Sequence, residues 1–411
     1  MSETPRPLGR QRLSALAAMT TFAIIAGACS GSSATAAPAS ATAPSAAPAT
    51  SAANPAPASA AASGDATAAF VAKVQADVAA AAAAQTTTSN PVPTGGPAVA
   101  AGKKIVIIPC SASVEGCARP ARSAKEAAEA IGWSATIDDP AGDGAKMSAA
   151  VQRAISSGAN GIILNSIDGA AIQGDLQAAK TAGLSIVCDM CGDTGGLPQA
   201  VVPPLAENER AGYLLGEESF LLAKQRFNAP PKFIVLLDDE FATVIARVNG
   251  VKKFIDDCKA AGAGCELVAE DKYLAANIST TGPARVVQLV QNNPGYNVIF
   301  AGYDAALNFF AKGLEQAGLA DPTKAFGVSV DADVANTDMI RTGGFQAATA
   351  GVAMHRVGYG MIDDLNRLIG GQQPVDQGVT VKLITKDNVP ATGAWDGDFD
   401  AIPLYLKAWG K

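Results

Sequence analysis

The chain has 411 residues, of which 48% are apolar, and a formal net charge of −7 at pH 7. This length suffices for two domains with substantial hydrophobic cores. Because the chain is acidic and contains no run rich in lysine and arginine, its electrostatics argue against a nucleic-acid partner, and we expect its partners to be small molecules and other proteins.

A short apolar run, residues 13–26, follows three arginines and ends in the small residues that precede Cys29. This arrangement is typical of an export signal. Small residues before a cysteine favour a lipoprotein signal, in which residues 1–28 are removed and Cys29 carries the lipid; a plain secretory signal is the alternative. The run is shorter than the roughly 20 residues of a membrane-spanning helix, and no later segment is long and apolar enough to span. We therefore expect an extracytoplasmic protein with a lipid anchor in the membrane.

Three segments of biased composition separate Cys29 from the first strand. Residues 29–64 are mostly Ala, Pro, Ser and Thr, which cannot bury enough apolar area to fold, so we expect a disordered tether. Residues 65–85 are rich in alanine and carry larger apolar side chains at helical spacing, which predicts a helix that either stands as a stalk or lies on the body. Residues 86–102, rich in Pro, Gly and Thr, are expected to form a linker.

From residue 103 onward, short apolar runs alternate with amphipathic stretches of about a dozen residues. The expected strands are residues 104–109, 134–137, 161–164, 185–188, 232–237, 266–269, 297–300 and 326–330. The expected helices include residues 120–131, 145–157, 170–182, 243–261 and 304–317. This alternation predicts an α/β protein with parallel sheets covered by helices on both faces. Ligands of such sheets bind beyond the carboxyl ends of the strands.

The loops after these strands lack the common enzymatic motifs. Neither the dinucleotide-binding and phosphate-binding glycine patterns nor the nucleophile elbow G-x-S-x-G is present. The single histidine, His355, lies among apolar residues, where a core or helix-surface position is the simpler interpretation than a catalytic or metal-binding role. We therefore expect no catalysis, no cofactor and no bound metal.

Six motifs follow one another in the order found in a known family. They are A-N-G-I-I-L-N at 159–165, A-A-K-T-A-G-L-S-I-V at 178–187, R-V-N-G at 247–250, F-A-G-Y-D at 300–304, V-S-V-D at 328–331 and L-I-T-K-D-N-V at 383–389. Over residues 103–389 the chain resembles the periplasmic sugar-binding proteins of ABC importers, of the ribose- and galactose-binding type, which are type I periplasmic binding proteins.

The resemblance implies two lobes, each a doubly wound parallel sheet, joined by a hinge of three crossings that closes over a ligand. The motifs place residues 103–205 and 353–389 in the first lobe, and residues 206–352 and 390–411 in the second. The implied function is capture of a small solute, a sugar or sugar-like molecule, and its delivery to the permease of an ABC importer by a monomeric protein. The alternative is a receptor that presents its solute to a membrane signalling partner.

The same resemblance assigns polar ligand contacts to Asp189, Arg247 and Asp331. An ionised carboxylate accepts hydrogen bonds from hydroxyl groups, and a guanidinium donates a rigid fork of them. The alternative is that the two aspartates cap helices or turns and that Arg247 is a surface charge. Further candidates for contact with the ligand are Tyr303, Tyr273, Met190, Val330 and Ser111.

Several positions depart from the family pattern. Met190, Tyr303 and Val352 replace polar residues that are common in the family, and Val330 stands where an aromatic is frequent. Tyr273, Tyr303 and Phe241 could supply the missing rings, although core packing is the alternative. These changes imply a ligand with fewer hydroxyl groups, or more apolar surface, than a hexose.

Apart from Cys29, six cysteines form three close pairs along the chain. The pairs are Cys110 and Cys117, Cys188 and Cys191, and Cys258 and Cys265. An even number of cysteines in an exported protein favours disulfides, and we expect them within each pair. Two alternatives stay open: a zinc site built from the first four thiolates, and a redox role for the second pair.

Overall fold

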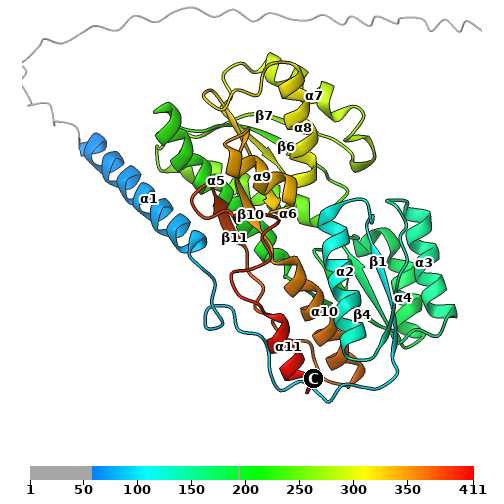
Figure 1. The fold of residues 1–411 in the computed structure, drawn as a ribbon. Helices are drawn as coiled ribbons and strands as arrows, with labels where there is room; N and C mark the ends of the chain where they lie inside the picture. Colours follow the sequence, from blue (N-terminus) through cyan, green and yellow to red (C-terminus); the bar gives the residue numbers. More distant parts are fainter. Residues whose placement is uncertain (1–57, 193–194) are drawn as a thin grey trace, which may run out of the picture. The chain divides into compact units, whose positions relative to one another are not determined.

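The computed structural model describes residues 58–192 and 195–411 (Figure 1). The expected signal segment, Cys29 and the tether up to residue 57 lie outside these residues. Within the described part of the chain, no helix combines the length and the apolar character that crossing a membrane requires.

The first sheet has five parallel strands in the order β2-β1-β3-β4-β5. Its strands are β1 (Lys104–Pro109), β2 (Ser134–Ile137), β3 (Gly161–Asn165), β4 (Ser185–Asp189) and β5 (Ala200–Val201). Its connecting helices are α2 (Glu115–Ala130), α3 (Gly144–Ser156), η1 (Gly169–Ile172) and α4 (Gln173–Thr181). β3 is buried along its whole length, because helices cover both faces of a parallel sheet.

The second sheet has six strands in the order β11-β10-β9-β8-β6-β7, and only β11 runs antiparallel to its neighbour. Its strands are β6 (Lys232–Leu237), β7 (Glu266–Lys272), β8 (Val298–Ala301), β9 (Phe326–Asp331), β10 (Gln346–Gly351) and β11 (Lys382–Thr385). Its helices are α5 (Leu205–Phe227), α6 (Ala242–Ala260), η2 (Ala275–Asn277), α7 (Gly282–Asn292), α8 (Asp304–Gln316) and α9 (Val334–Thr342). The predicted α/β alternation is therefore confirmed in both lobes.

Between β1 and β11, the chain crosses three times between the two sheets, as the resemblance implied. The first crossing, residues 202–204, leads from β5 to α5, and the second, residues 352–353, leads from β10 to α10 (Met354–Ile369). α10 packs against α2 and β4 in the first lobe. The third crossing, residues 370–381, returns from α10 to β11 in the second sheet.

Two C-terminal segments lie in the lobe opposite to the one suggested by the sequence. β11 pairs with β10, so residues 382–385 belong to the second sheet rather than to the first lobe. Conversely, α11 (Ile402–Ala408) packs on α10 in the first lobe, where the Tyr359 ring lies 5.9 Å from that of Tyr405 and 5.8 Å from that of Trp409. Strand pairing and aromatic packing decide both placements, and neither leaves a periodic pattern in the sequence.

The N-terminal helix lies on the second lobe. α1 (Ala58–Ala82) begins earlier than expected and packs against α5, with the Phe70 ring 5.8 Å from Phe220 and 5.9 Å from Phe254. Val74 on the same helix is fully buried. Of the two expected arrangements, stalk or contact with the body, the structure has the second.

The segment between α1 and β1 is held by the first lobe. Arg356 and Asn366 of α10 donate hydrogen bonds to the carbonyl oxygens of Pro91 and Pro97, at 2.8 and 3.2 Å. Trp133 donates to the carbonyl oxygen of Ala100 at 2.6 Å. The expected linker is therefore docked along the hinge side of the protein and provides a further covalent connection between the lobes.

Candidate functional site

A cavity of about 490 Å³ lies between the lobes, at the carboxyl ends of strands from both sheets. Its volume is within the range of sites for small ligands, roughly 300–1,000 Å³. The first lobe contributes the loops after β1, β3 and β4, and the second contributes the loops after β6, β8 and β9 together with the first turns of α6. The predicted residues Ser111, Met190, Arg247, Tyr303 and Asp331 all line it.

Arg247 is the most highly connected side chain of this cavity. It is only 2% exposed, and its Nε donates to Asn208 at 3.0 Å. The remaining nitrogens donate to the carbonyl oxygen of Gly302 at 2.9 Å, to a carboxylate oxygen of Asp331 at 3.0 Å and to the sulfur of Met190 at 3.4 Å. Because Met190 belongs to the first lobe, Arg247 contacts both lobes at once.

Close packing of two helices explains how Arg247 is positioned. A Cβ atom added to Gly212 on α5 would lie 1.8 Å from the carbonyl oxygen of Arg247, and one added to Gly250 on α6 would lie 1.9 Å from that of Glu209. Only glycine permits helix backbones to approach this closely. The backbone of α6 therefore packs directly against that of α5, and the first turns of α6 face the cavity.

Asp331 sits at the end of β9 with a backbone φ of 123°, a region that residues with side chains rarely adopt. Burial raises the pKa of its carboxyl group, while Arg247 and Arg119 counteract that effect. Gly116 of α2 comes so close that a Cβ there would lie 3.2 Å from the carboxylate oxygen not bonded to Arg247. Asp331 thus contacts the first lobe from the second.

A buried ion pair also joins the lobes beside the cavity. Arg119 on α2 donates to Asp333 of the second lobe at 2.9 Å and to Asp396 of the C-terminal segment at 2.7 Å. The side chains of Arg119 and Asp333 are only 7% and 6% exposed. The two lobes therefore contact each other through α2, as expected for a cavity enclosed by both.

Asp189 does not line the cavity. Its carboxyl group is fully buried, and one oxygen accepts a hydrogen bond from the backbone N–H of Ser166 at 2.9 Å. Burial raises the pKa of Asp189 to about 8, although the Ser166 N–H and the Asn165 side chain lower it. Burial therefore favours the neutral form of this acid, which holds the loop after β3, whereas the sequence suggested an ionised contact with the ligand.

Two further predicted residues belong to the core. Val330 is fully buried in β9, and the ring of Tyr273 lies 5.2 Å from that of Phe310 and 6.1 Å from that of Tyr303. Neither lines the cavity. Phe241 does so, and it forms an edge-to-face pair with Tyr303 at 6.4 Å. The aromatic wall of the site is therefore built from the second lobe.

Several lining residues were not predicted. Ser113, Ser166 and Asp168 come from the first lobe, and Glu240 comes from the loop after β6. All of them follow predicted strands, so the rule that ligands bind beyond strand ends could have found them. Among the described residues, the charged ones that line the cavity are Asp168, Glu240, Asp331 and Arg247, so its charge is predominantly acidic.

All three expected disulfides are present. Cys110 is bonded to Cys117, Cys188 to Cys191 and Cys258 to Cys265. The four cysteines of the first lobe are therefore not arranged as a four-thiolate zinc site, and no other group of metal-binding side chains occurs in the described residues. Cys110 and Cys117 line the cavity. The exposed His355, on α10, is not among its lining residues.

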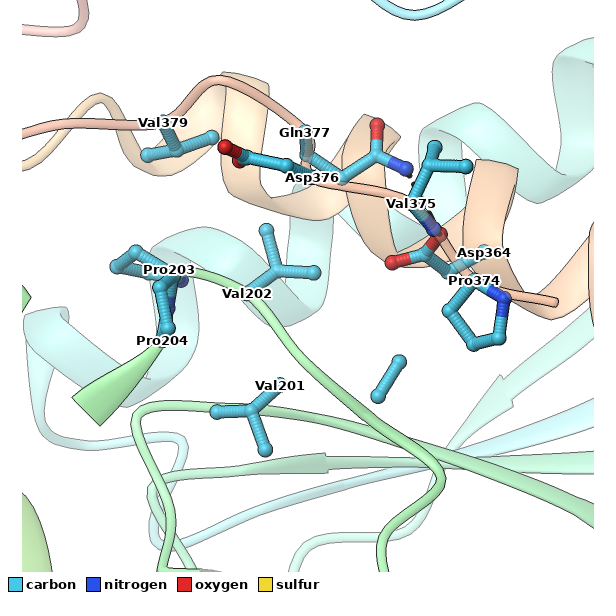
Figure 2. A pocket seen from close by; sticks show the side chains of 11 residues that line it. Val201, Val202, Pro203, Pro204, Asp364, Pro374, Val375, Asp376, Gln377 and Val379 are labelled. Atoms are coloured by element: carbon cyan, nitrogen blue, oxygen red, sulfur yellow. Dashed lines mark hydrogen bonds between the residues drawn. The ribbon is translucent and has the colours of Figure 1, made fainter. Parts of the chain in front are cut away.

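A second, smaller cavity of about 330 Å³ lies on the hinge (Figure 2). Residues 200–204 and residues 374–379 form two of its walls, and Asp364 of α10 also lines it. It shares no lining residue with the larger cavity and contains none of the predicted ligand contacts. The cavity between the lobes is therefore the candidate for the principal site.

Residues 105–373 match the model of a protein family described as the periplasmic binding protein domain. The match covers more than half of the chain and includes both lobes. The chain belongs to this family. No curated protein matches this periplasmic binding protein in sequence.

Solved structures of similar fold cover nearly the whole body. A solute-binding protein from Mycobacterium smegmatis with bound glycerol is 20% identical, with a TM-score of 0.61, over 72% of this chain and 99% of that one. A 5-methylthioribose-binding protein from Thermotoga lettingae is 19% identical, with a TM-score of 0.60, over 75% and 92% of the two chains. A glucose-galactose binding protein from Geobacillus stearothermophilus is 18% identical, with a TM-score of 0.60, over 71% and 100%. These likenesses establish the fold of this periplasmic binding protein.

The buried acid Asp189 leads to a prediction about pH. Its pKa of about 8 in the folded protein exceeds the ordinary value of 3.8, so its contribution to stability is full below pH 3.8 and is lost as the pH rises through 8. Asp189→Asn removes this titration. We expect the variant to gain stability relative to the wild type between pH 5 and pH 8, on the order of a few kcal/mol, in urea unfolding.

Asp256 on α6 is exposed, so Asp256→Asn provides a control that removes a carboxylate from the surface and not from the core. If Asp189→Asn and the wild type lost stability in parallel between pH 5 and pH 8, Asp189 would be ionised in the folded protein.

Proposed function

We propose that this protein captures a small neutral solute, a sugar, a polyol or a related molecule with fewer hydroxyl groups, and delivers it to the permease of an ABC importer. The observation that carries this proposal is the cavity between two lobes that are joined by three crossings. Family membership supports a binding role outside the cytoplasm. The named ligands of similar structures, glycerol, 5-methylthioribose and glucose or galactose, support the ligand class.

The chemistry of the cavity favours a neutral ligand with some apolar surface. Arg247 has its nitrogens engaged by protein groups, so it offers little to an anion. Asp331 and Ser111 supply acceptors and donors for hydroxyl groups, while Phe241, Tyr303 and Met190 supply apolar contact. Closure of the lobes would remove the ligand from water. Each paired polar group contributes more in the less polar interior than it does in water.

A stability screen with the protein tests the ligand class. A bound sugar or polyol at about 100 times its dissociation constant should stabilise the protein by about 2.7 kcal/mol, whereas sugar phosphates should not, because the acidic cavity repels them. Asp331→Asn should weaken binding at least about tenfold. Asp321→Asn should not, because the half-buried Asp321 does not line the cavity. Binding of a different class only, such as aromatic acids, would contradict the proposed class.

We further propose that the mature chain is a monomer that begins at Cys29 and carries its lipid there, so that the binding body stays near the membrane. The sequence pattern before Cys29 supports the start of the mature chain and the position of the lipid. Cys29→Ser should shift the protein from the membrane fraction to the soluble fraction, and retention of the variant in the membrane fraction would exclude a lipid anchor at this residue.

A further inference from the structure

We propose that the smaller cavity on the hinge is a second ligand site, which binds a small organic ammonium ion with a compact aliphatic body. It lies between the first and third crossings, and its volume of about 330 Å³ is at the lower end of the range for small-ligand sites (Figure 2). This site is separate from the principal cavity, so the inference does not depend on the solute proposed above.

The walls of this cavity are suited to an aliphatic body. Val202 and Pro203 belong to the first crossing, and Val375 and Val379 belong to the third. Figure 2 shows the two segments facing each other across the cavity. Burial of apolar ligand surface against such walls favours binding. A small branched or cyclic hydrocarbon group would pack against these apolar walls.

Asp364 supplies the polar group. Its side chain is almost entirely buried, and one carboxylate oxygen accepts hydrogen bonds from the Val375 N–H and from the Gln377 amide, both at 2.9 Å. Figure 2 shows the carboxylate directed into the space between the two crossing segments. No cationic side chain among the described residues forms an ion pair with it. A buried carboxylate with an oxygen toward a cavity is suited to a charge-assisted bond with an ammonium group.

The surrounding charges favour a cation. Among the described residues, Asp364 and the exposed Asp376 are the only charged ones that line the cavity. On α10, Asp363 and Arg367 form an ion pair with each other at 2.7 Å, so Arg367 does not neutralise the cavity. Two carboxylates are too few for a metal site, and no group of three or more metal-binding side chains occurs in the described residues. An organic ammonium therefore fits better than an anion or a metal ion.

The pH dependence of binding follows from the same group. Burial raises the pKa of Asp364 to about 7; Asp363 raises it further, and Arg367, the Val375 N–H and Gln377 lower it. The ammonium requires the ionised carboxylate. Because the ionised fraction falls about tenfold between pH 8 and pH 6 for such a group, the affinity should fall about tenfold as well.

The probe for the experiment is cyclohexylammonium, with cyclohexanol as the neutral molecule of matched shape. Titration of the full-length protein at pH 8, followed by ligand-observed NMR, should show saturable binding of the ammonium at least about tenfold tighter than that of the alcohol. Asp364→Asn should weaken ammonium binding at least about tenfold. The matched variant Asp376→Asn should change it by at most about twofold, because its charge is screened by solvent.

Val201→Phe provides a second variant that fills the cavity and leaves the carboxylate in place, in case Asp364→Asn does not fold. It should abolish binding of the probe. Equal affinity for the ammonium and the alcohol, unchanged affinity in a folded Asp364→Asn or Val201→Phe variant, or no saturable binding to the wild type at pH 8 would each overturn the proposal.

Discussion

Replacing Arg247 with methionine is expected to lower the free energy of unfolding by about 3–5 kcal/mol. The guanidinium pairs with Asp331 at 3.0 Å, and both side chains are almost fully buried, at 3% and 6% exposure. Removal of one partner leaves an uncompensated buried carboxylate, which is the costly case for a buried ion pair. Asn208 and the carbonyl group of Gly302 lose their donor as well. Urea unfolding followed by circular dichroism measures the loss.

Arg285 offers a matched control, because it pairs with Asp271 on the surface and its side chain is 51% exposed. Arg285→Met should cost at most about 1 kcal/mol. The double variant Arg247→Met/Asp331→Asn should recover part of the loss, since it no longer buries a charge without a partner. Equal costs for the two arginine variants would show that Arg247 and Asp331 are solvated, and that the lobes do not enclose them.

The disulfide between Cys110 and Cys117 is expected to stabilise both the fold and the ligand-binding loop. It ties the end of β1 to the first turn of α2, and Ser111, Ser113 and Val114 in the enclosed loop line the cavity. Cys110→Ser/Cys117→Ser should lower the stability by about 2–3 kcal/mol. Binding should weaken at least about tenfold, because a loop that is no longer held must be ordered by the ligand.

The chain contains its own control for this prediction. Cys258 and Cys265 have the same sequence separation of 7 and the same Cα–Cα distance of 5.8 Å, but they lie at the end of α6, away from the cavity. Cys258→Ser/Cys265→Ser should therefore cost similar stability and leave the affinity unchanged. The ligand is the sugar or polyol found in the screen, and calorimetric titration measures both affinities. If both double variants lost affinity equally, the weaker binding would result from general destabilisation and not from the loop at the cavity.

Secondary structure followed closely from local pattern in the body of the protein. The run expected to form a strand at residues 104–109 is β1, and the helix expected at residues 243–261 is α6 with a shift of one residue. β10 was not predicted, because Thr349 is the one strand-favouring residue in its sequence, Q-A-A-T-A-G. Its pairing with β9 and β11 makes it a strand.

The candidate site was predictable in part. Asp331 ends a strand, and Ser111 and Met190 lie within two residues of a strand end. Parallel sheets bring the carboxyl ends of their strands together, so these residues converge on the cavity as expected. Asp189 also ends a strand, yet its carboxyl group turns into the protein and accepts a hydrogen bond from the Ser166 N–H. Side-chain direction at a strand end depends on the neighbouring loop, which lies far away in the sequence.

The sequence by itself determined the α/β class, the family, the three pairs of cysteines and five of the residues that line the cavity between the lobes, because these depend on periodicity, spacing and the ends of strands. Tertiary structure alone decided that Asp189 is buried in a way that favours its neutral form, and that α1 packs on the second lobe. It also decided that β11 lies in the second lobe and α11 in the first, each opposite to the sequence-based expectation. Each of these outcomes depends on burial or on pairing between segments distant in sequence, and local patterns carry no record of such contacts.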